Sequence, residues 1–307
     1  AITNTTTTTT EPNPSDAGTR EGRGFSESRH RAGQWNTTRA TTRNPLVRAL
    51  WAFISGKRAG VDRLARRAGG QGPVLDLGCG TAAYAHWFLA RRPATVVALD
   101  WSVESLRRIV PPRRGRILRV CADAQYLPFA CHRFDAVFSI DVLGHIPDVD
   151  RVLDECVRVA TPGCRLFLHS ECADYRLRLP DRALIARTGV DRIAQLDGHT
   201  GLRLSREFRA ACVARFAVDT FTCPAGVPGW LIGYPEKYRI AFRDAGMKGA
   251  AALTGIFTFI KALPLAGGLL RLLNALWTRL EILIGLSGGG SCFCEMRKAS
   301  EPEQKGV

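Results

Sequence analysis

Between residues 73 and 223, short apolar runs rich in Val, Ile, Leu and Phe alternate with segments of helical periodicity. This repeated order of strand and helix predicts a parallel, doubly wound α/β sheet, so the expected fold class is α/β with a Rossmann-like seven-stranded sheet. The expected strands are Val74–Leu77, Thr95–Leu99, Ile117–Cys121, Phe134–Ile140, Arg165–His169, Ala217–Cys223 and Ser291–Arg297. The expected helices between them are Ala82–Arg91, Ser102–Val110, Val149–Ala160 and Ser205–Phe216.

The segments around this alternating core differ from it in composition. Residues 1–44 contain a threonine run and few large apolar residues, which predicts a disordered tail. In residues 45–72, apolar and basic residues interleave as in amphipathic helices, which either cap the domain or form a lid or membrane-surface contact. We therefore expect one domain over 45–307, with its core at 73–223 and its last strand within 291–298.

Residues 224–290 form an apolar insertion that an α/β sheet does not need. No uncharged run in it reaches about 18 residues, so a simple transmembrane helix is not expected. On a helical wheel of residues 269–284, apolar and polar residues separate onto opposite faces. The apolar face holds Leu269, Leu270, Leu272, Leu273, Leu276, Trp277, Leu280, Leu283 and Ile284, and the polar face holds Arg271, Asn274, Thr278 and Glu281. This pattern predicts a helix packed on its own domain, a monotopic membrane contact or a lid over an apolar substrate.

The charge and the cysteine content limit which partners and which cell compartment are expected for this protein. Lys plus Arg is 43 against 28 Asp plus Glu, a net charge of +15 that gathers towards both ends of the chain. Such basic flanks suit either nucleic acid or an anionic membrane surface. The ten cysteines form no C-x-x-C pair and no Cys/His cluster, so we predict free buried thiols, no metal site and a cytoplasmic location. The sequence also begins without an apolar secretion signal.

A glycine-containing turn follows the first expected strand, in the segment Val-Leu-Asp-Leu-Gly-Cys-Gly at 74–80. Gly78 and Gly80 allow close approach of a ligand to the backbone, and the next helix begins there. The same spacing also fits a dinucleotide site. However, Asp76 precedes the turn, Asp100 ends the second strand and Asp123 follows the third. Three carboxylates without a basic residue suit a cationic nucleoside better than a polyphosphate.

These segments resemble class I S-adenosylmethionine-dependent methyltransferases, especially the small-molecule branch that includes ubiquinone and menaquinone C-methyltransferases. The resemblance rests on V-L-D-L-G-C-G-T at 74–81, V-A-L-D-W-S at 97–102, C-A-D-A-Q-Y-L-P-F at 121–129, F-D-A-V-F-S-I-D-V-L-G-H-I-P-D at 134–148 and E-C-V-R-V-A-T-P-G at 155–163. It implies S-adenosyl-L-methionine as the cofactor. The family's third glycine of the turn is Ala82 here.

The resemblance also assigns cofactor-binding roles to individual residues. Asp76, Gly78 and Gly80 would hold the methionine part of the cofactor, and Asp100 would bind the ribose. Trp101 would pack on the adenine, and Asp123 and Ala124 would meet its edge. The complete cofactor-binding set is Asp76, Gly78, Cys79, Gly80, Asp100, Trp101, Asp123, Ala124 and Ile140. A carboxylate at a strand end can instead simply cap the next helix.

The candidates for catalysis and substrate binding follow the fourth and fifth strands. Asp141 and His145 come after the fourth strand, and His145 is a candidate base or a hydrogen-bonded structural histidine. We expect the substrate to be contacted by His169, Glu171, Tyr175 and His199. Of these, His199 lies in a polar loop, where a histidine is often only a solvated turn residue.

The remaining motifs favour a small-molecule methyltransferase. The fourth strand ends in Ser-Ile-Asp-Val, not in the N/D-P-P-F/Y phrase of amino-methylating nucleic-acid enzymes, and there is no Pro-Cys nucleophile. We therefore expect an O- or C-methyltransferase for a small, hydrophobic acceptor such as a lipid, a quinone or a polyketide-like metabolite. Peripheral contact with the inner face of an anionic membrane is expected, and a nucleic-acid partner is not. The alternatives are an RNA methyltransferase with basic flanks for phosphate contacts, and a non-catalytic cofactor-binding module.

Overall fold

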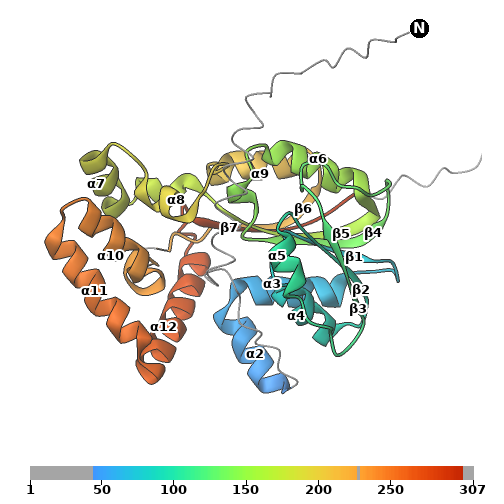
Figure 1. Cartoon of the computed structure of the whole chain (residues 1–307), viewed down its shortest axis with the longest axis horizontal. Coiled ribbons are helices and arrows are strands. Elements are labelled where there is room, and N and C mark those ends of the chain that lie inside the picture. The colour runs from blue at the N-terminus through green and yellow to red at the C-terminus, as the bar shows by residue number, and fades with distance from the viewer. Residues whose placement is uncertain (1–43, 227–228, 300–307) are drawn as a thin grey trace, which may run out of the picture.

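The computed structural model describes residues 44–226 and 229–299; the tail predicted at 1–44 lies outside this part of the chain except for Asn44. A seven-stranded sheet runs through the molecule in the order β3-β2-β1-β4-β5-β7-β6 (Figure 1). The strands are β1 Val74–Leu77, β2 Thr95–Asp100, β3 Arg116–Cys121, β4 Phe134–Ile140, β5 Ala160–Glu171, β6 Ala217–Thr222 and β7 Ser291–Arg297. This arrangement confirms the α/β Rossmann-like fold class and all seven expected strands.

The first five strands are parallel, whereas β7 runs antiparallel to both β5 and β6. The chain order reverses at the centre, because β1 pairs with β2 on one side and with β4 on the other. In open α/β sheets, ligands bind outside the carboxyl ends of the strands at such a reversal. The turns after β1, β2 and β4 therefore meet at one edge of the sheet.

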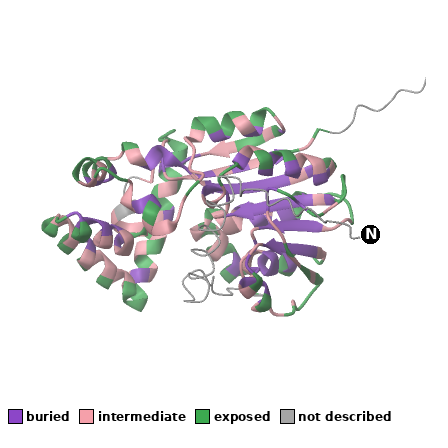
Figure 2. Ribbon diagram, turned by 45° about the horizontal axis from the view of Figure 1, so that its top comes forward, coloured by how far each residue is buried: buried purple, intermediate pink, exposed green. Residues whose placement is uncertain are grey.

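Helices cover both faces of the sheet, with α3, α4 and α5 on one side and α6 and α9 on the other (Figure 1). The strands are the most buried part of the structure (Figure 2). The helices packed around the sheet are α2 Pro45–Ile54, α3 Gly56–Arg67, α4 Ala83–Arg91, α5 Val103–Arg107, η1 Leu143–His145, α6 Val149–Val159 and α9 Ser205–Val213. Helix α5 and helix α9 end earlier than the sequence predicted.

A second group of helices forms a lobe beyond the sheet, on the left of Figure 1. It consists of η2 Ala173–Leu177, α7 Leu179–Thr188, α8 Arg192–Asp197, η3 Gly229–Gly233, α10 Pro235–Asp244, α11 Lys248–Ala262 and α12 Pro264–Leu283. Only the second part of this lobe falls in the predicted insertion at 224–290. The helices between β5 and α9 were not expected, and they pack on α10 around Leu184, Tyr238 and Phe242.

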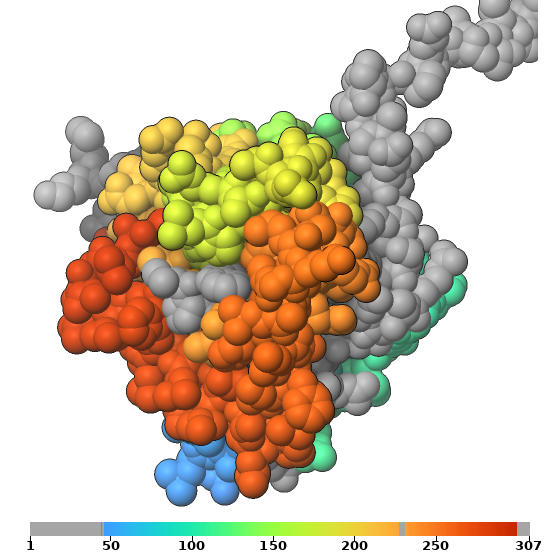
Figure 3. Space-filling model, turned by 90° about the vertical axis from the view of Figure 1, so that its left-hand side faces the viewer, coloured from blue at the N-terminus to red at the C-terminus, as the bar shows by residue number. Residues whose placement is uncertain are grey.

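Helix α12 turns its polar side inwards. Arg271, Asn274 and Thr278 line a cavity inside the molecule, while Leu276, Leu280 and Leu283 of the opposite side are exposed. Figure 3 looks onto this lobe, with α12 in red, α11 in orange and α2 in blue below them. The two faces predicted for this helix are thus present, and the apolar one is uncovered.

No single helix in the described ranges is long and apolar enough to cross a bilayer. Helices α11 and α12 reach the required length and composition only as a pair, and they meet at a bend of 109°.

The cysteines carry free thiols, as predicted, and eight of the ten are buried; Cys121 and Cys131 are exposed. Cys292 and Cys294 both lie on the buried face of β7.

Helix α3 packs on the sheet through a residue without a side chain. A Cβ atom added to Gly60 would lie 2.0 Å from Cζ of Phe167, which is itself fully buried in β5. We predict that Gly60→Ala lowers the free energy of unfolding by about 1–3 kcal/mol through overpacking, even though alanine favours helices. Urea denaturation of the purified variant measures this change.

The matched control is Gly249→Ala in α11, where an added Cβ meets nothing within 4 Å. That substitution should leave stability unchanged or raise it by up to about 1 kcal/mol. A Gly60→Ala protein as stable as the wild type would contradict the close packing of α3 on β5.

Candidate active site

A cavity of about 1000 Å³ opens at the carboxyl ends of β1, β2, β4 and β5. Helices α2 and α3 form one wall, and α10 and α12 form another. Every cofactor-binding, catalytic and substrate residue that the sequence singled out lines this one cavity. The structure therefore brings together residues that are up to 123 positions apart, from Asp76 to His199.

Hydrogen bonds hold the turn after β1 against the end of β2. The N–H groups of Gly78 and Cys79 both donate to the carbonyl of Leu99, over 2.8 and 2.9 Å, and the N–H of Gly80 donates to Oδ2 of Asp100 over 2.8 Å. Gly78 has φ +72°, and an added Cβ would lie 2.3 Å from Val142. This turn therefore requires glycine and brings the backbone close to the carboxylate of Asp100.

Asp76 is a buried carboxyl at this end of the cavity, and its Oδ2 has no hydrogen-bond partner among the described residues. Burial, followed by the nearby charge of Asp100, raises the pKa of Asp76 well above its usual range. A cationic ligand would stabilise the ionised form of such a carboxyl. Asp123 accepts hydrogen bonds from the backbone and side chain of Gln125, and Trp101 also lines the cavity.

The residues thus fit S-adenosylmethionine. An acceptor-rich end suits its amine, sulfonium and ribose hydroxyls, and the glycine turn leaves room for it.

At the centre of the cavity, Lys57 of α3 reaches Asp141 at the end of β4. The Lys57 Nζ lies 2.6 and 2.5 Å from the two carboxylate oxygens. Burial disfavours the charged form of both groups, but the attraction between the two charges outweighs this effect. The pKa of Lys57 is therefore raised, and Lys57 and then His169 hold the pKa of Asp141 well below its usual range. An aspartate held ionised by a lysine is a weak base.

Asp141 also has φ +61°, a left-handed backbone conformation that is uncommon for residues other than glycine. Strain of this kind, which costs about 1–2 kcal/mol, is found mostly where a side chain must point in one direction for function.

Asp141, His169 and Glu171 place one ligand atom each within 4.8 Å of one another, which is close enough for a metal ion. Nδ1 of the buried His169 lies 2.9 Å from Oδ1 of Asp141. Lys57 already supplies a positive charge to this cluster, so the arrangement is a partly buried network of charges. Burial, and then the charge of Asp141, raise the pKa of Glu171 well above its usual range, which favours its protonated form.

Two histidines lie side by side next to this network. The rings of His145 and His199 are 4.6 Å apart, and Nδ1 of His145 is 3.2 Å from the carbonyl of Gly198. The loop of His199 is fixed by Thr200, whose Oγ1 donates to the carbonyl of His145. Burial lowers the pKa of both imidazoles, that of His199 to about 4 with the help of His145. Both rings are therefore neutral at pH 7, and the low pKa of His199 makes it a weak base.

Sequence reasoning missed several residues of the cavity. Lys57 and Arg58 lie in the basic segment for which a lid was considered, but nothing in the sequence indicated that they face β4. Tyr234 and Lys237 come from the insertion, where no motif marked them.

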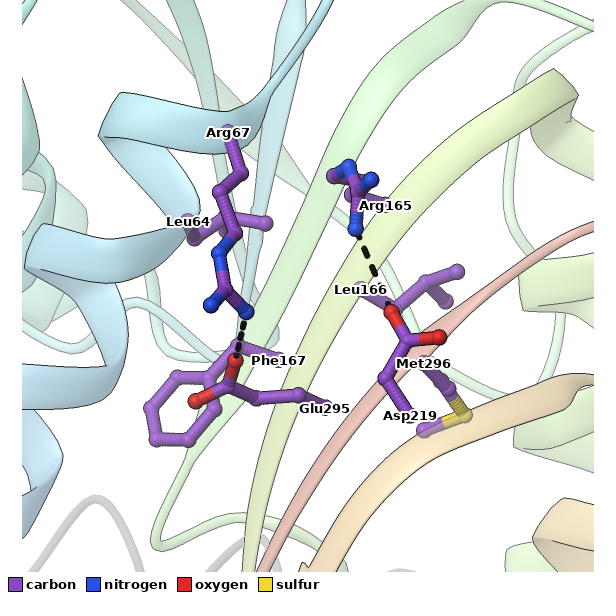
Figure 4. Close-up of a pocket in the computed structure, with 8 residues that line it drawn as sticks. All are labelled: Leu64, Arg67, Arg165, Leu166, Phe167, Asp219, Glu295 and Met296. Carbon is purple, nitrogen blue, oxygen red and sulfur yellow. Dashed lines mark hydrogen bonds and ion pairs between the residues drawn. The ribbon is translucent and has the colours of Figure 1, made fainter.

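A second hollow, of only about 10 Å³, lies beside the middle of β5 (Figure 4). It is bounded by the ion pairs Arg67–Glu295 and Arg165–Asp219, and it is too small to hold a substrate.

The fold and this site define a class I S-adenosylmethionine-dependent methyltransferase domain, whose cofactor is S-adenosylmethionine. Residues 75–168 match the family model described as a methyltransferase domain. A demethylmenaquinone methyltransferase of Thermobifida fusca is 43% identical over 100 residues, which are 31% of this chain and 42% of that protein. A malonyl-[acyl-carrier protein] O-methyltransferase of Methylococcus capsulatus is 28% identical over 69% of this chain and 78% of that protein.

Among the solved structures, a protein of Bacillus halodurans described as a candidate methyltransferase superposes with a TM-score of 0.50 and 18% identity. The match covers 80% of this chain and all of that one, and it supports the fold alone. Some curated relatives match this chain over about 100 residues only, and the chain then spans 36–42% of the length of those relatives.

The half-buried imidazole of His199 predicts a dependence of stability on pH. In the unfolded chain its pKa is about 6.5, and in the folded protein it is about 4. Between these values the unfolded state binds a proton that the folded state does not, so stability falls as the pH is lowered through this window. We expect wild type to lose stability relative to His199→Gln from about pH 6.5 to about pH 4.

Urea denaturation of both proteins across this pH range measures the difference. His132→Asn serves as the control, because His132 is exposed and outside the cavity. A gap between wild type and His199→Gln that stays constant with pH would show that His199 is not held neutral by burial.

Proposed function

We propose that this chain is an active S-adenosylmethionine-dependent O- or C-methyltransferase whose acceptor is a small, hydrophobic molecule such as a lipid, quinone or polyketide-like metabolite. The observation that carries the proposal is the single cavity in which the acidic cofactor end adjoins the pair of neutral histidines. The named relatives, a quinone methyltransferase and a malonyl-carrier methyltransferase, support a small acceptor group.

The roles of the residues follow from their environment. The bound cofactor supplies an electrophilic methyl group on a sulfonium. Asp76 and Asp100 bind and orient it through acceptor oxygens, and Trp101, Asp123, Ala124 and Ile140 line its nucleoside part. His145 is neutral and accepts the proton of an acceptor hydroxyl or acidic carbon, and His199 packs against its ring at the substrate end of the cavity. Asp141, ionised and bound to Lys57, orients His169 and the substrate rather than removing a proton.

The helical lobe forms one wall of the substrate end. Tyr175 and Glu171 lie on the wall of the cavity after β5, and the protonated carboxyl of Glu171 can donate a hydrogen bond to an acceptor oxygen. Held in this way, the nucleophile is oriented for an in-line displacement, which gains much of its rate from positioning alone.

Incubation with methyl-labelled S-adenosylmethionine and host-cell fractions tests the proposal. We predict that label accumulates in the lipid or apolar metabolite fraction, because the substrate end of the cavity is lined by Ile193, Ile232 and Tyr238 of the lobe as well as by polar side chains. Asp100→Asn should reduce labelling at least about tenfold by removing a charged acceptor. Asp219→Asn, beside the small hollow of Figure 4, is the matched control and should label normally.

Label in the RNA fraction would contradict the small-molecule acceptor. Binding of S-adenosylhomocysteine without turnover on any fraction would instead indicate a non-catalytic cofactor-binding module.

The exposed face of α12 supports a second part of the proposal, that the enzyme works at the surface of an anionic membrane. On α12, Leu269, Leu276 and Leu283 are 57%, 46% and 82% exposed, and Leu46 and Leu50 of the neighbouring α2 are 78% and 52% exposed. Contiguous apolar surface of this kind is a sign of an interaction site. The net charge of +15 complements anionic lipid. A cytoplasmic location at the inner membrane face is part of the same proposal.

Liposome flotation measures this contact. We predict that the protein floats with vesicles containing phosphatidylglycerol and that Leu276→Asp weakens flotation severalfold, since a charge on the contact face opposes insertion. Leu118→Asp is the control, because Leu118 on β3 is 42% exposed and β3 lies at the far end of the sheet. Equal loss with both variants, or no flotation of wild type, would refute the membrane contact.

A further inference from the structure

The cavity contains more positive charge than its acidic groups neutralise. Lysine and arginine side chains from α3, the loop after η2, α10, α11 and α12 line its substrate end: Lys57, Arg58, Arg63, Arg178, Lys237, Lys261, Arg271 and Arg279. Of the six acids that line the cavity, three gather at the cofactor end, Asp76, Asp100 and Asp123, and the other three are Asp141, Glu171 and Asp197. The cofactor end and the substrate end of this cavity therefore carry opposite charge.

Half of these cations have carboxylate partners. Lys57 pairs with Asp141 over 2.5 Å, Arg63 with Glu295 over 2.5 Å, Lys237 with Asp197 over 2.7 Å and Lys261 with Glu236 over 3.0 Å. In the described part of the chain, no carboxylate lies within ion-pair distance of the other four, which are Arg58, Arg178, Arg271 and Arg279.

Arg58 and Arg279 are held by aromatic residues of α2. The Arg58 guanidinium lies 4.6 Å from the ring centre of Trp51, and that of Arg279 lies 4.0 Å from the ring centre of Phe53. Nη2 of Arg279 donates to the backbone carbonyl of Phe53 over 3.0 Å. Stacking fixes the plane of a guanidinium and leaves N–H groups at its edge free to bind an oxyanion in a bidentate way.

Arg58 is also half-buried without a carboxylate partner among the described residues. Burial lowers the pKa of its guanidinium. Arg178 also lines the cavity: its Nη2 donates to the carbonyl of Ala225, but its buried Nε has no hydrogen-bond partner among the described residues. Burying an unpaired cation is costly, and the arrival of an anion removes that cost.

We propose that the acceptor substrate carries an anionic group of the phosphate or carboxylate class, and that Arg58 and Arg279 provide the positive charge that binds it. This inference rests on the proposed function, because it concerns the substrate end of the same cavity. The acceptor is then an anionic amphiphile, with its apolar part between the helices of the lobe and its charged group towards the wall formed by α2 and α12. The opposite sign of the cofactor end keeps this anion away from the carboxylates that bind the cofactor.

Isothermal titration calorimetry with matched octyl compounds tests the inference. The full chain is first titrated with S-adenosylhomocysteine, which tests the cofactor site on its own. The saturated protein is then titrated with octyl phosphate, octyltrimethylammonium and octanol, each below its micelle concentration, and with inorganic phosphate. We expect octyl phosphate to bind at least about tenfold more tightly than octyltrimethylammonium.

Variants identify the arginines. Arg58→Gln and Arg279→Gln should each weaken octyl phosphate binding by roughly tenfold to a hundredfold, which is the loss of a charge-assisted hydrogen bond. Arg58→Lys keeps the charge and should lose less. Arg165→Gln, in the ion pair of Figure 4, should bind as wild type does.

Two results would overturn the inference. One is equal affinity for the anionic and cationic octyl compounds, and the other is unchanged octyl phosphate binding in both Arg→Gln variants. In either case, intact S-adenosylhomocysteine binding leaves the proposed methyltransferase function standing. If inorganic phosphate binds as tightly as octyl phosphate, the anion site stands and its ligand is a free phosphate group rather than a lipid headgroup.

Discussion

The reversal of strand order at β1 is the constraint on which the site depends. Because β1 lies between two parallel neighbours, the turns after β1, β2 and β4 leave the sheet at the same edge. The glycine turn, Asp100 and Asp141 are neighbours for this reason, although they are far apart in sequence. The Lys57–Asp141 ion pair then fixes α3 to this edge, so that a segment preceding the core becomes a wall of the cavity.

The side chains that line the cavity are grouped by charge and differ in protonation state. Carboxylates gather where a cationic cofactor is bound, and arginines gather where the acceptor is proposed to bind. Between them, neutral imidazoles, a protonated glutamic acid and an ionised aspartate lie close together. Their states differ because burial acts on all of them, whereas the ion pair with Lys57 outweighs burial for the aspartate alone. Two carboxyl groups in contact thus take different protonation states without any metal ion being needed to explain it.

Much of the core could be predicted from the sequence, because its signals are local. Apolar runs at 74–77 and 134–140 define strands by themselves, and the glycine turn has a fixed spacing to Asp76. The cofactor end follows from these motifs. The helices at 179–197 carry no strong amphipathic pattern and pack on α10 through contacts far apart in sequence, so they were missed. Lys57 was missed for the same reason, since its partner lies 84 positions later.

The orientation of α12 has a consequence for how such a protein can change. Its inner side touches the acceptor cavity through Arg271, Asn274 and Thr278, while its outer side is uncovered. Substitutions on the two sides therefore act on separate properties, the lining of the cavity and the composition of the exposed face. One helix can diverge along both lines independently, so that related chains can exchange substrates while keeping the same outer surface.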